Sequence, residues 1–223
     1  GSGYAITTNR IKSITVEDCT VKNYAFGFLY ANKATTNVTV KNVTVSNAKI
    51  TSNHYAGAIA GWAESGARLN NIINCHVKNS QITISAEQLA NGNYDNGDKA
   101  GAIAGFWYFG SIEGCTATDV TVKAYRDLGG IVGIAQGGAV VSNNEIKNVT
   151  LIQDNSHNYK NYTKAEELNV NSFVGRKAAN DNGVLPTIEN NKGLAEIVID
   201  LEGLATTPME MIQNTPGATV TLP

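Results

Sequence analysis

A short glycine-rich box occurs four times along the chain, and this repetition limits what the sequence can fold into. The copies span residues 56–61, 100–105, 128–133 and 170–175, and the first two both read AGAIAG. Repeats of this kind fold as similar units, and each unit buries its apolar face against its neighbours. We therefore expect an elongated body built from stacked repeats.

A pattern typical of short β-strands follows the boxes. Alternating apolar residues, such as Val43 with Val45, place their side chains on one face of a strand. An Asn, Asp or Gly, which tolerates left-handed backbone angles, precedes four residues at equivalent positions: Cys19, Val43, Cys75 and Cys115. Short strands and tight corners predict an all-β parallel β-helix (β-solenoid), in which each strand pairs with its equivalent in the next coil.

Stacking of equivalent residues predicts two inward columns. One contains the apolar residue near the centre of each box: Ile59, Ile103, Ile131 and Phe173. The other contains the residue after each corner, with Asn144 as its extension: Cys19, Val43, Cys75 and Cys115. The shortest interval between boxes, from Gly101 to Gly129, sets the length of a coil. Longer intervals therefore predict extruded loops at residues 85–99 and 153–169.

The boxes and the strands after them, such as Asn74-Cys75-His76-Val77, resemble the GLUG motif. The resemblance extends over roughly residues 14–195. It implies a right-handed, pectate-lyase-like parallel β-helix from a secreted or cell-surface bacterial protein. Such repeats are mostly interpreted as structural or adhesive modules, so the resemblance also implies a role of that kind.

The C-terminal stretch differs from the repeats. Residues 208–213 predict a short helix, and residues 215–223 predict a Pro-Gly turn and a strand. This arrangement is similar to the entry cap of a pectate-lyase-like β-helix, which would begin a following module. Alternatively, it covers the open end of this solenoid, whose last strands would otherwise be exposed edges. We divide the chain into a solenoid, residues 1–200, and a cap or following module, residues 201–223.

Composition narrows the classes of partner. The 223 residues have a formal net charge of −2, and Lys and Arg are scattered, so nothing favours nucleic acid. No apolar run approaches the ~20 residues that span a bilayer, so we expect no membrane span. No signal sequence is visible. The adhesive role that the resemblance implies would have glycans or host or bacterial surface proteins as its partners.

The three cysteines occupy equivalent places in the repeat, which favours buried core residues over metal ligands. A disulfide between stacked cysteines is the alternative. No nucleophile motif or HExxH accompanies the histidines, and His76 falls in an outward position that is typical of a surface residue.

One extruded segment has oxygen-bearing side chains at alternate positions, as calcium loops do: Asn91, Asn93, Asp95 and Asp98. It lacks the glycine of an EF-hand at the sixth position, and Ala102 stands where a bidentate Glu would close the loop. We expect a turn without a cofactor, and calcium binding is the alternative.

The run Phe106-Trp107-Tyr108-Phe109 departs most from the repeat. Alignment after the box places Phe106 in an inward column with Ile134, and places Trp107 where other coils have alanine. Either these aromatic side chains fill a gap beneath a loop, or Trp107, Tyr108 and Phe109 form an exposed platform. A platform of this kind suits sugar rings or protein partners.

Catalysis by polysaccharide-cleaving β-helices requires carboxylates gathered on one face. Here the outward acidic residues of the coils occur singly: Glu17, Glu64, Glu113 and Glu145. We therefore expect no catalytic residues and a non-enzymatic structural stalk or adhesin-like binding module, secreted or at the bacterial cell surface. Two alternatives stay open. One is a carbohydrate-active β-helix, acting as a polysaccharide lyase or glycoside hydrolase, and the other is an accessory region of a larger surface peptidase.

Overall fold

The structure is a computed structural model, and the residues that it describes are these: 10–11, 14–16, 20–22, 29–31, 39–52, 55–63, 70–84, 99–154, 169–199 and 219–221. Over these ranges the chain forms strands and turns without a helix, which confirms the all-β prediction. Cys19, most of both expected loops and the expected C-terminal helix lie outside the described residues.

The described strands form three sheets, and the paired strands are parallel. Sheet A contains β1 (Arg10–Ile11), β4 (Leu29–Ala31), β5 (Thr39–Lys41), β9 (Ala60–Ala63), β10 (Asn70–Ile73), β13 (Ala104–Glu113), β16 (Val132–Ser142), β19 (Val174–Ala178) and β20 (Thr187–Glu189). Sheet B contains β2 (Ile14–Val16), β3 (Thr20–Lys22), β6 (Val43–Ser46), β7 (Lys49–Ser52), β11 (His76–Ile84), β14 (Thr116–Ala124), β17 (Glu145–Gln153), β21 (Glu196–Ile199) and β22 (Thr219–Thr221). Sheet C contains β8 (Tyr55–Ala56), β12 (Lys99–Gly101), β15 (Asp127–Gly129) and β18 (Asn169–Asn171).

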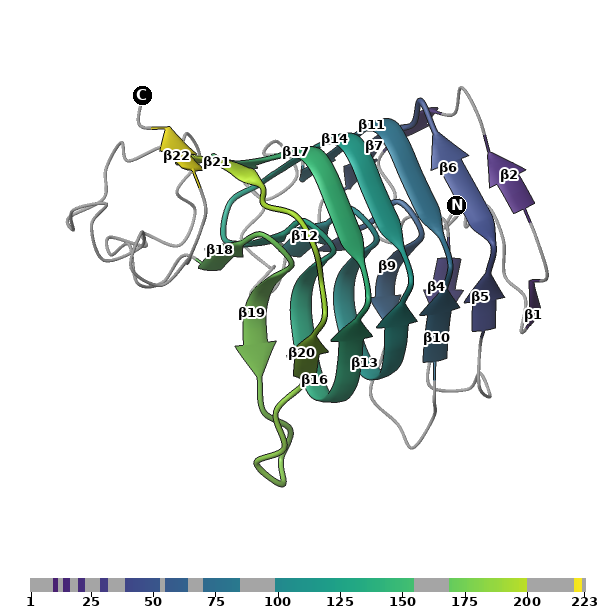
Figure 1. Cartoon of the computed structure of the whole chain (residues 1–223), viewed down its shortest axis with the longest axis vertical. Helices are drawn as coiled ribbons and strands as arrows, with labels where there is room; N and C mark the ends of the chain where they lie inside the picture. The colour runs from purple at the N-terminus through teal and green to yellow at the C-terminus, as the bar shows by residue number, and fades with distance from the viewer. Residues whose placement is uncertain are drawn as a thin grey trace.

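Each repeat visits the sheets in the same order, C, then A, then B. One repeat consists of β12, β13 and β14, and the next consists of β15, β16 and β17. Equivalent residues pair between repeats, as Lys99 does with Asp127 and Val120 with Val149. Figure 1 shows the strands of sheets A and B side by side in chain order. The strand expected near the C-terminus is present as β22, which pairs with β21.

Corner residues with left-handed backbone angles separate sheet A from sheet B. The φ angle lies between 51° and 63° at five equivalent positions, Asn42, Asn74, Gly114, Asn143 and Asn190. This confirms the predicted corners, because Asn and Gly adopt the conformation with less strain than other residues. A second set of left-handed residues, which the sequence analysis missed, lies further along each repeat: Asn47, Asn79, Asp119 and Asn148.

The glycine that ends a box lets two stretches of backbone approach closely, as at Gly105, Gly133 and Gly175. At Gly133, a Cβ atom would lie 2.6 Å from the carbonyl oxygen of Gly105 and 2.7 Å from the amide nitrogen of Ala100. Atoms of the preceding repeat therefore occupy the space that any side chain would need. The box can repeat in stacked copies only because these positions are glycine.

The apolar residues of the boxes lie one above another. The amide of Ile59 donates to the carbonyl of Ile103 at 3.0 Å, that of Ile103 to Ile131 at 2.9 Å, and that of Ile131 to Phe173 at 3.0 Å. The three isoleucines have no exposed surface, and Phe173 packs partly buried against the same core. This column forms the apolar centre of the stack.

A second inward column is polar, and we call Cys75, Cys115, Asn144 and Asn191 the polar column. The amide of Cys75 donates to Cys115 Sγ at 3.5 Å, and that of Cys115 donates to Asn144 Oδ1 at 2.9 Å. The amide of Asn144 donates to Asn191 Oδ1 at 3.0 Å. Each side chain therefore accepts a backbone N–H from the neighbouring repeat, so a buried polar residue is satisfied without water.

We predict that Gly133→Ala destabilises the fold by about 3 kcal/mol. The new methyl group would overlap backbone atoms of Ala100 and Gly105, which the paired strands of the preceding repeat hold in place. Gly114→Asn is the matched control. Its Cβ would lie 3.9 Å from the nearest atom, and Asn tolerates the left-handed angle that it would inherit. Urea unfolding of both variants measures the difference, and equal midpoints would contradict the close-approach argument.

We also predict that Asn144→Ala lowers the free energy of unfolding by about 2 kcal/mol, because it leaves the buried N–H of Cys115 without a partner. The substitution also removes the hydrogen bond that Asn144 Nδ2 donates to the carbonyl of Ile112 at 3.0 Å. Asn144→Cys introduces the residue type that the preceding two repeats have at this position, and it should lower the free energy of unfolding less than Asn144→Ala does. Chemical denaturation of the two variants tests this order, and a smaller loss for alanine than for cysteine would refute it.

Candidate binding surface

Trp107 lies inside the stack, which corrects the prediction that it belongs to an exposed platform. Its side chain is 1% exposed and belongs to the apolar core. Its partner in register on β16 is Ala135, which is fully buried and whose small side chain leaves room for an indole ring. Trp107 therefore fills a gap in the core and offers no surface to a partner.

The expected inward orientation of Phe106 is wrong for the same reason. Successive residues of a strand point to opposite faces, so the inward Trp107 places Phe106 and Tyr108 outside. Both are half-buried, and Phe106 is not part of the apolar core. Ile134, the partner of Phe106 in register, is fully buried but is likewise outside that core.

Four aromatic rings outside the apolar core lie next to one another, and we call Tyr55, Phe106, Tyr108 and Phe109 the aromatic cluster. Tyr55 is buried and the other three are half-buried. The ring centroids of Tyr55 and Phe106 are 5.8 Å apart, and those of Phe106 and Tyr108 are 6.4 Å apart. Tyr108 and Phe109 meet edge to face at 4.5 Å. These spacings are typical of attractive aromatic pairs, so the rings support one another in fixed positions.

Phe109 has an unusual backbone conformation. Its φ angle is 60°, and the pairing of β13 with β16 shifts register between Tyr108 and Gly110. A β-bulge here changes which face the following residues occupy, so Gly110 and Ile112 lie buried, like Trp107. The bulge turns the ring of Phe109 onto Gly138, where a Cβ would lie 3.2 Å from Phe109 Cδ1.

A tight loop between β19 and β20 borders the aromatic cluster. Asn180 Oδ1 accepts hydrogen bonds from the amides of Asn182 at 3.0 Å and Val184 at 2.9 Å. Gln136, the partner of Tyr108 in register, donates from Nε2 to the carbonyl of Ala179 at 3.1 Å. The loop is therefore held by side-chain amides, and it exposes Val184 and its neighbour Leu185.

A group of charged and polar side chains, the ionic cluster, lies beside these rings where sheet C meets sheet A: Lys99, Arg126, Asp127, Asn169 and Arg176. Lys99 is 2% exposed and Asp127 has no exposed surface. Asp127 Oδ1 accepts from Asn169 Nδ2 at 2.6 Å, and Asp127 Oδ2 lies 3.4 Å from Arg126 Nε and 3.7 Å from Arg176 Nε. Lys99 Nζ lies 5.2 Å from the ring centroid of Tyr55, which joins the ionic and aromatic clusters.

Sequence reasoning missed the ionic cluster, although the repeat contained its signal. The residue immediately before each box is equivalent from one repeat to the next. These residues are Tyr55, Lys99, Asp127 and Asn169. They pair in register on successive strands of sheet C. Aligning the residues before the boxes, and not only those after them, would have shown a polar column here.

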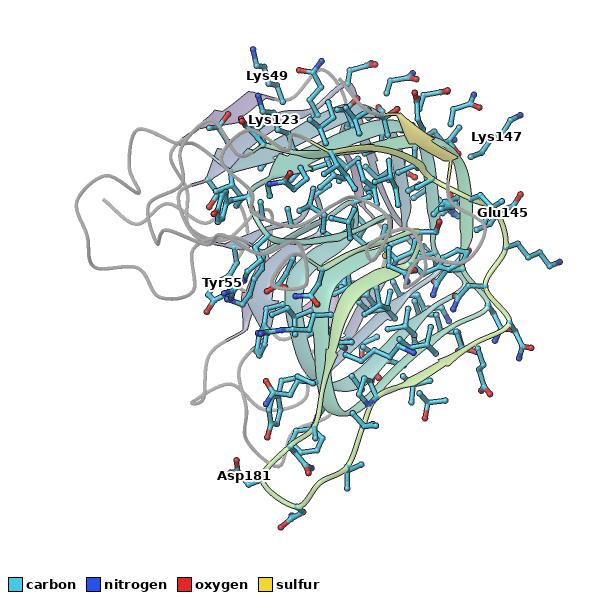
Figure 2. All side chains as sticks on the ribbon, turned by 90° about the vertical axis from the view of Figure 1, so that its left-hand side faces the viewer. Lys49, Tyr55, Lys123, Glu145, Lys147 and Asp181 are labelled. Carbon is cyan, nitrogen blue, oxygen red and sulfur yellow. The ribbon has the colours of Figure 1, made fainter. Side chains whose placement is uncertain are left out.

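The remaining candidates are dispersed. Exposed Glu113 ends β13 in sheet A, and exposed Glu145 begins β17 in sheet B, so these two acids lie on different sheets. Among the described residues, no group of three His, Cys, Asp or Glu side chains could hold a metal ion. The calcium candidates Asn91, Asn93, Asp95 and Asp98 lie outside the described ranges, as do Glu17 and Glu64. Figure 2 shows Tyr55 on a different side of the molecule from Glu145 and Lys147.

His76 is half-buried on the outer face of β11, and its Nδ1 lies 2.9 Å from Thr116 Oγ1. Burial, together with the charge of Lys78, lowers the pKa of His76. The imidazole is therefore neutral over a wider pH range than a free histidine. This behaviour is that of a histidine built into a sheet face.

A scan against protein-family models, a search of curated proteins and a search of solved structures each give no match. Over the residues that the structure describes, no helix is long and apolar enough to cross a membrane. What the surface binds must therefore be inferred from its own geometry.

We predict that the stacked thiols do not react in the folded protein. Cys75 and Cys115 are free and have no exposed surface. The side-chain hydrogen bond with Cys75, together with burial, raises the pKa of Cys115 far above that of a free thiol, so no thiolate forms there. The same bond lowers the pKa of Cys75, but the side chain of Cys75 is buried where a reagent cannot reach it. In a Cys19→Ser background, a thiol reagent should label neither cysteine at pH 8 and both in guanidinium. Fast labelling without denaturant would contradict the buried positions.

Proposed function

We propose that this chain is a rigid β-solenoid stalk with adhesin-like binding on its outer face, from a secreted or cell-surface bacterial protein. In this proposal residues 1–200 form a right-handed parallel β-helix of GLUG-type repeats with extruded loops. Residues 201–223 cap it or begin a following module. The observation that carries the proposal is the in-register parallel pairing of equivalent residues in all three sheets.

Rigidity follows from the direction of the hydrogen bonds. In parallel sheets that stack repeats, backbone hydrogen bonds run from one repeat to the next at a spacing of about 4.8 Å. The polar column adds side-chain bonds along the same direction, for example from Asn191 Nδ2 to the carbonyl of Val141 at 2.9 Å. Separating two repeats would break both sets of bonds together, which suits a module that holds a shape under load.

Adhesion is supported by the outer surface of the same stack. The aromatic cluster presents three half-buried rings, Phe106, Tyr108 and Phe109, on a frame of paired strands. Aromatic side chains of this kind bind with little loss of conformational entropy. Glycans and surface proteins are the partner classes that such rings fit.

We predict that the chain releases no products from a panel of neutral and acidic polysaccharides, with or without calcium, while a polysaccharide lyase assayed in parallel does. Product release that Asp127→Asn abolishes would overturn the stalk and establish an enzyme.

We also predict uniformly slow hydrogen exchange for the paired amides of β13, β14, β16 and β17, because the ladder opens as one unit. Rapid exchange confined to one sheet would argue against a load-bearing rod.

A further inference from the structure

We propose that the aromatic cluster binds a neutral saccharide, with one pyranose ring seated against Tyr108 and Phe109. The proposal rests on the adhesin-like function above and names the ligand class for the same surface. Three observations lead to it: a strained phenylalanine, a glycine floor beneath its ring, and open amide groups at its border.

Strain at Phe109 is the first observation. Among the described residues, every other non-glycine residue with a positive φ angle is Asn or Asp. An aromatic residue in this region is a true outlier, and strain of this kind gathers at functional sites. Folding alone would favour Asn or Gly, as at Gly137 in the next repeat, where φ is 64°. The ring of Phe109 therefore has a use that Asn and Gly cannot supply.

The glycine floor is the second observation. Gly137 and Gly138 lie under Phe109, and a Cβ at these positions would come within 3.6 Å and 3.2 Å of its ring atoms. Tyr108 supports the same ring from its edge. The ring is thus held in place before a ligand arrives, which lowers the entropy lost on binding.

Open amides are the third observation, and they favour a saccharide. Gln136 uses Nε2 to bond Ala179, so its Oε1 is left to accept from a ligand. Asn180 uses Oδ1 to hold its own loop, so its Nδ2 is left to donate. That Nδ2 lies 3.7 Å from the Cβ position of Gly137, beside the Phe109 ring. Sugar hydroxyls require both a donor and an acceptor next to an apolar face, and uncharged amides suit an uncharged sugar.

Phe109→Asn is the decisive variant, because asparagine relieves the strain and removes only the ring. Binding is screened on an array of neutral and acidic oligosaccharides, and the best neutral ligand is then titrated by calorimetry. We expect Phe109→Asn to weaken binding roughly tenfold or more while the melting temperature stays equal or rises. Tyr108→Ala should weaken binding similarly, and Val184→Ser, in the adjacent loop, should not.

Several results would overturn the proposal. These are an array without a neutral ligand, unchanged affinity in Phe109→Asn, or a fall in melting temperature that shows Phe109 to be structural. Binding of acidic sugars alone, or of a protein through Val184 and Leu185, would also refute it. None of these results bears on the proposal that the chain is a stalk, because that proposal is tested by the cleavage and hydrogen-exchange measurements above.

Discussion

In-register pairing between repeats is the constraint on which the rest of the structure depends. Because parallel strands pair equivalent residues, each side chain lies on the side chain of the same position one repeat away. A column must therefore be compatible in size and polarity along its whole length. Ile59, Ile103 and Ile131 meet this requirement by being identical. Cys115 and Asn144 meet it because a thiol and an amide can both accept the N–H of the neighbouring repeat.

The regular part of the fold was predictable because it repeats. Four boxes gave the repeat, and an Asn or Gly before each strand gave the left-handed corners at Asn42, Asn74 and Gly114. These signals are local in sequence and recur in several repeats, so the pattern is unlike one that arises by chance. Stacked parallel strands follow from them by simple sterics, since Gly133 admits no side chain against the backbone of the previous box.

The candidate site was less predictable because it breaks the repeat. Alignment placed Phe106 inside, but strand alternation and a bulge at Phe109 decide which rings face outward. A single inserted residue reverses the parity of a strand, and no spacing rule shows where the bulge lies. The ionic cluster was missed for another reason. Lys99 and Asp127 lie far apart in sequence, and only their positions before the boxes bring them together.

The two kinds of buried polar group serve different ends. Inside the stack, the polar column is uncharged, since a buried ion would require a partner in every repeat. The charges of the ionic cluster instead lie around Asp127 on sheet C, which has Arg126 and Arg176 within 4 Å. The contact with Arg176 joins sheet C to β19, as the Tyr55–Phe106 pair joins sheet C to β13. Both contacts join sheet C to sheet A, although they involve different repeats. A strained residue such as Phe109 can persist where the contacts around it, here with Tyr108 and Gly138, hold the surrounding structure in place.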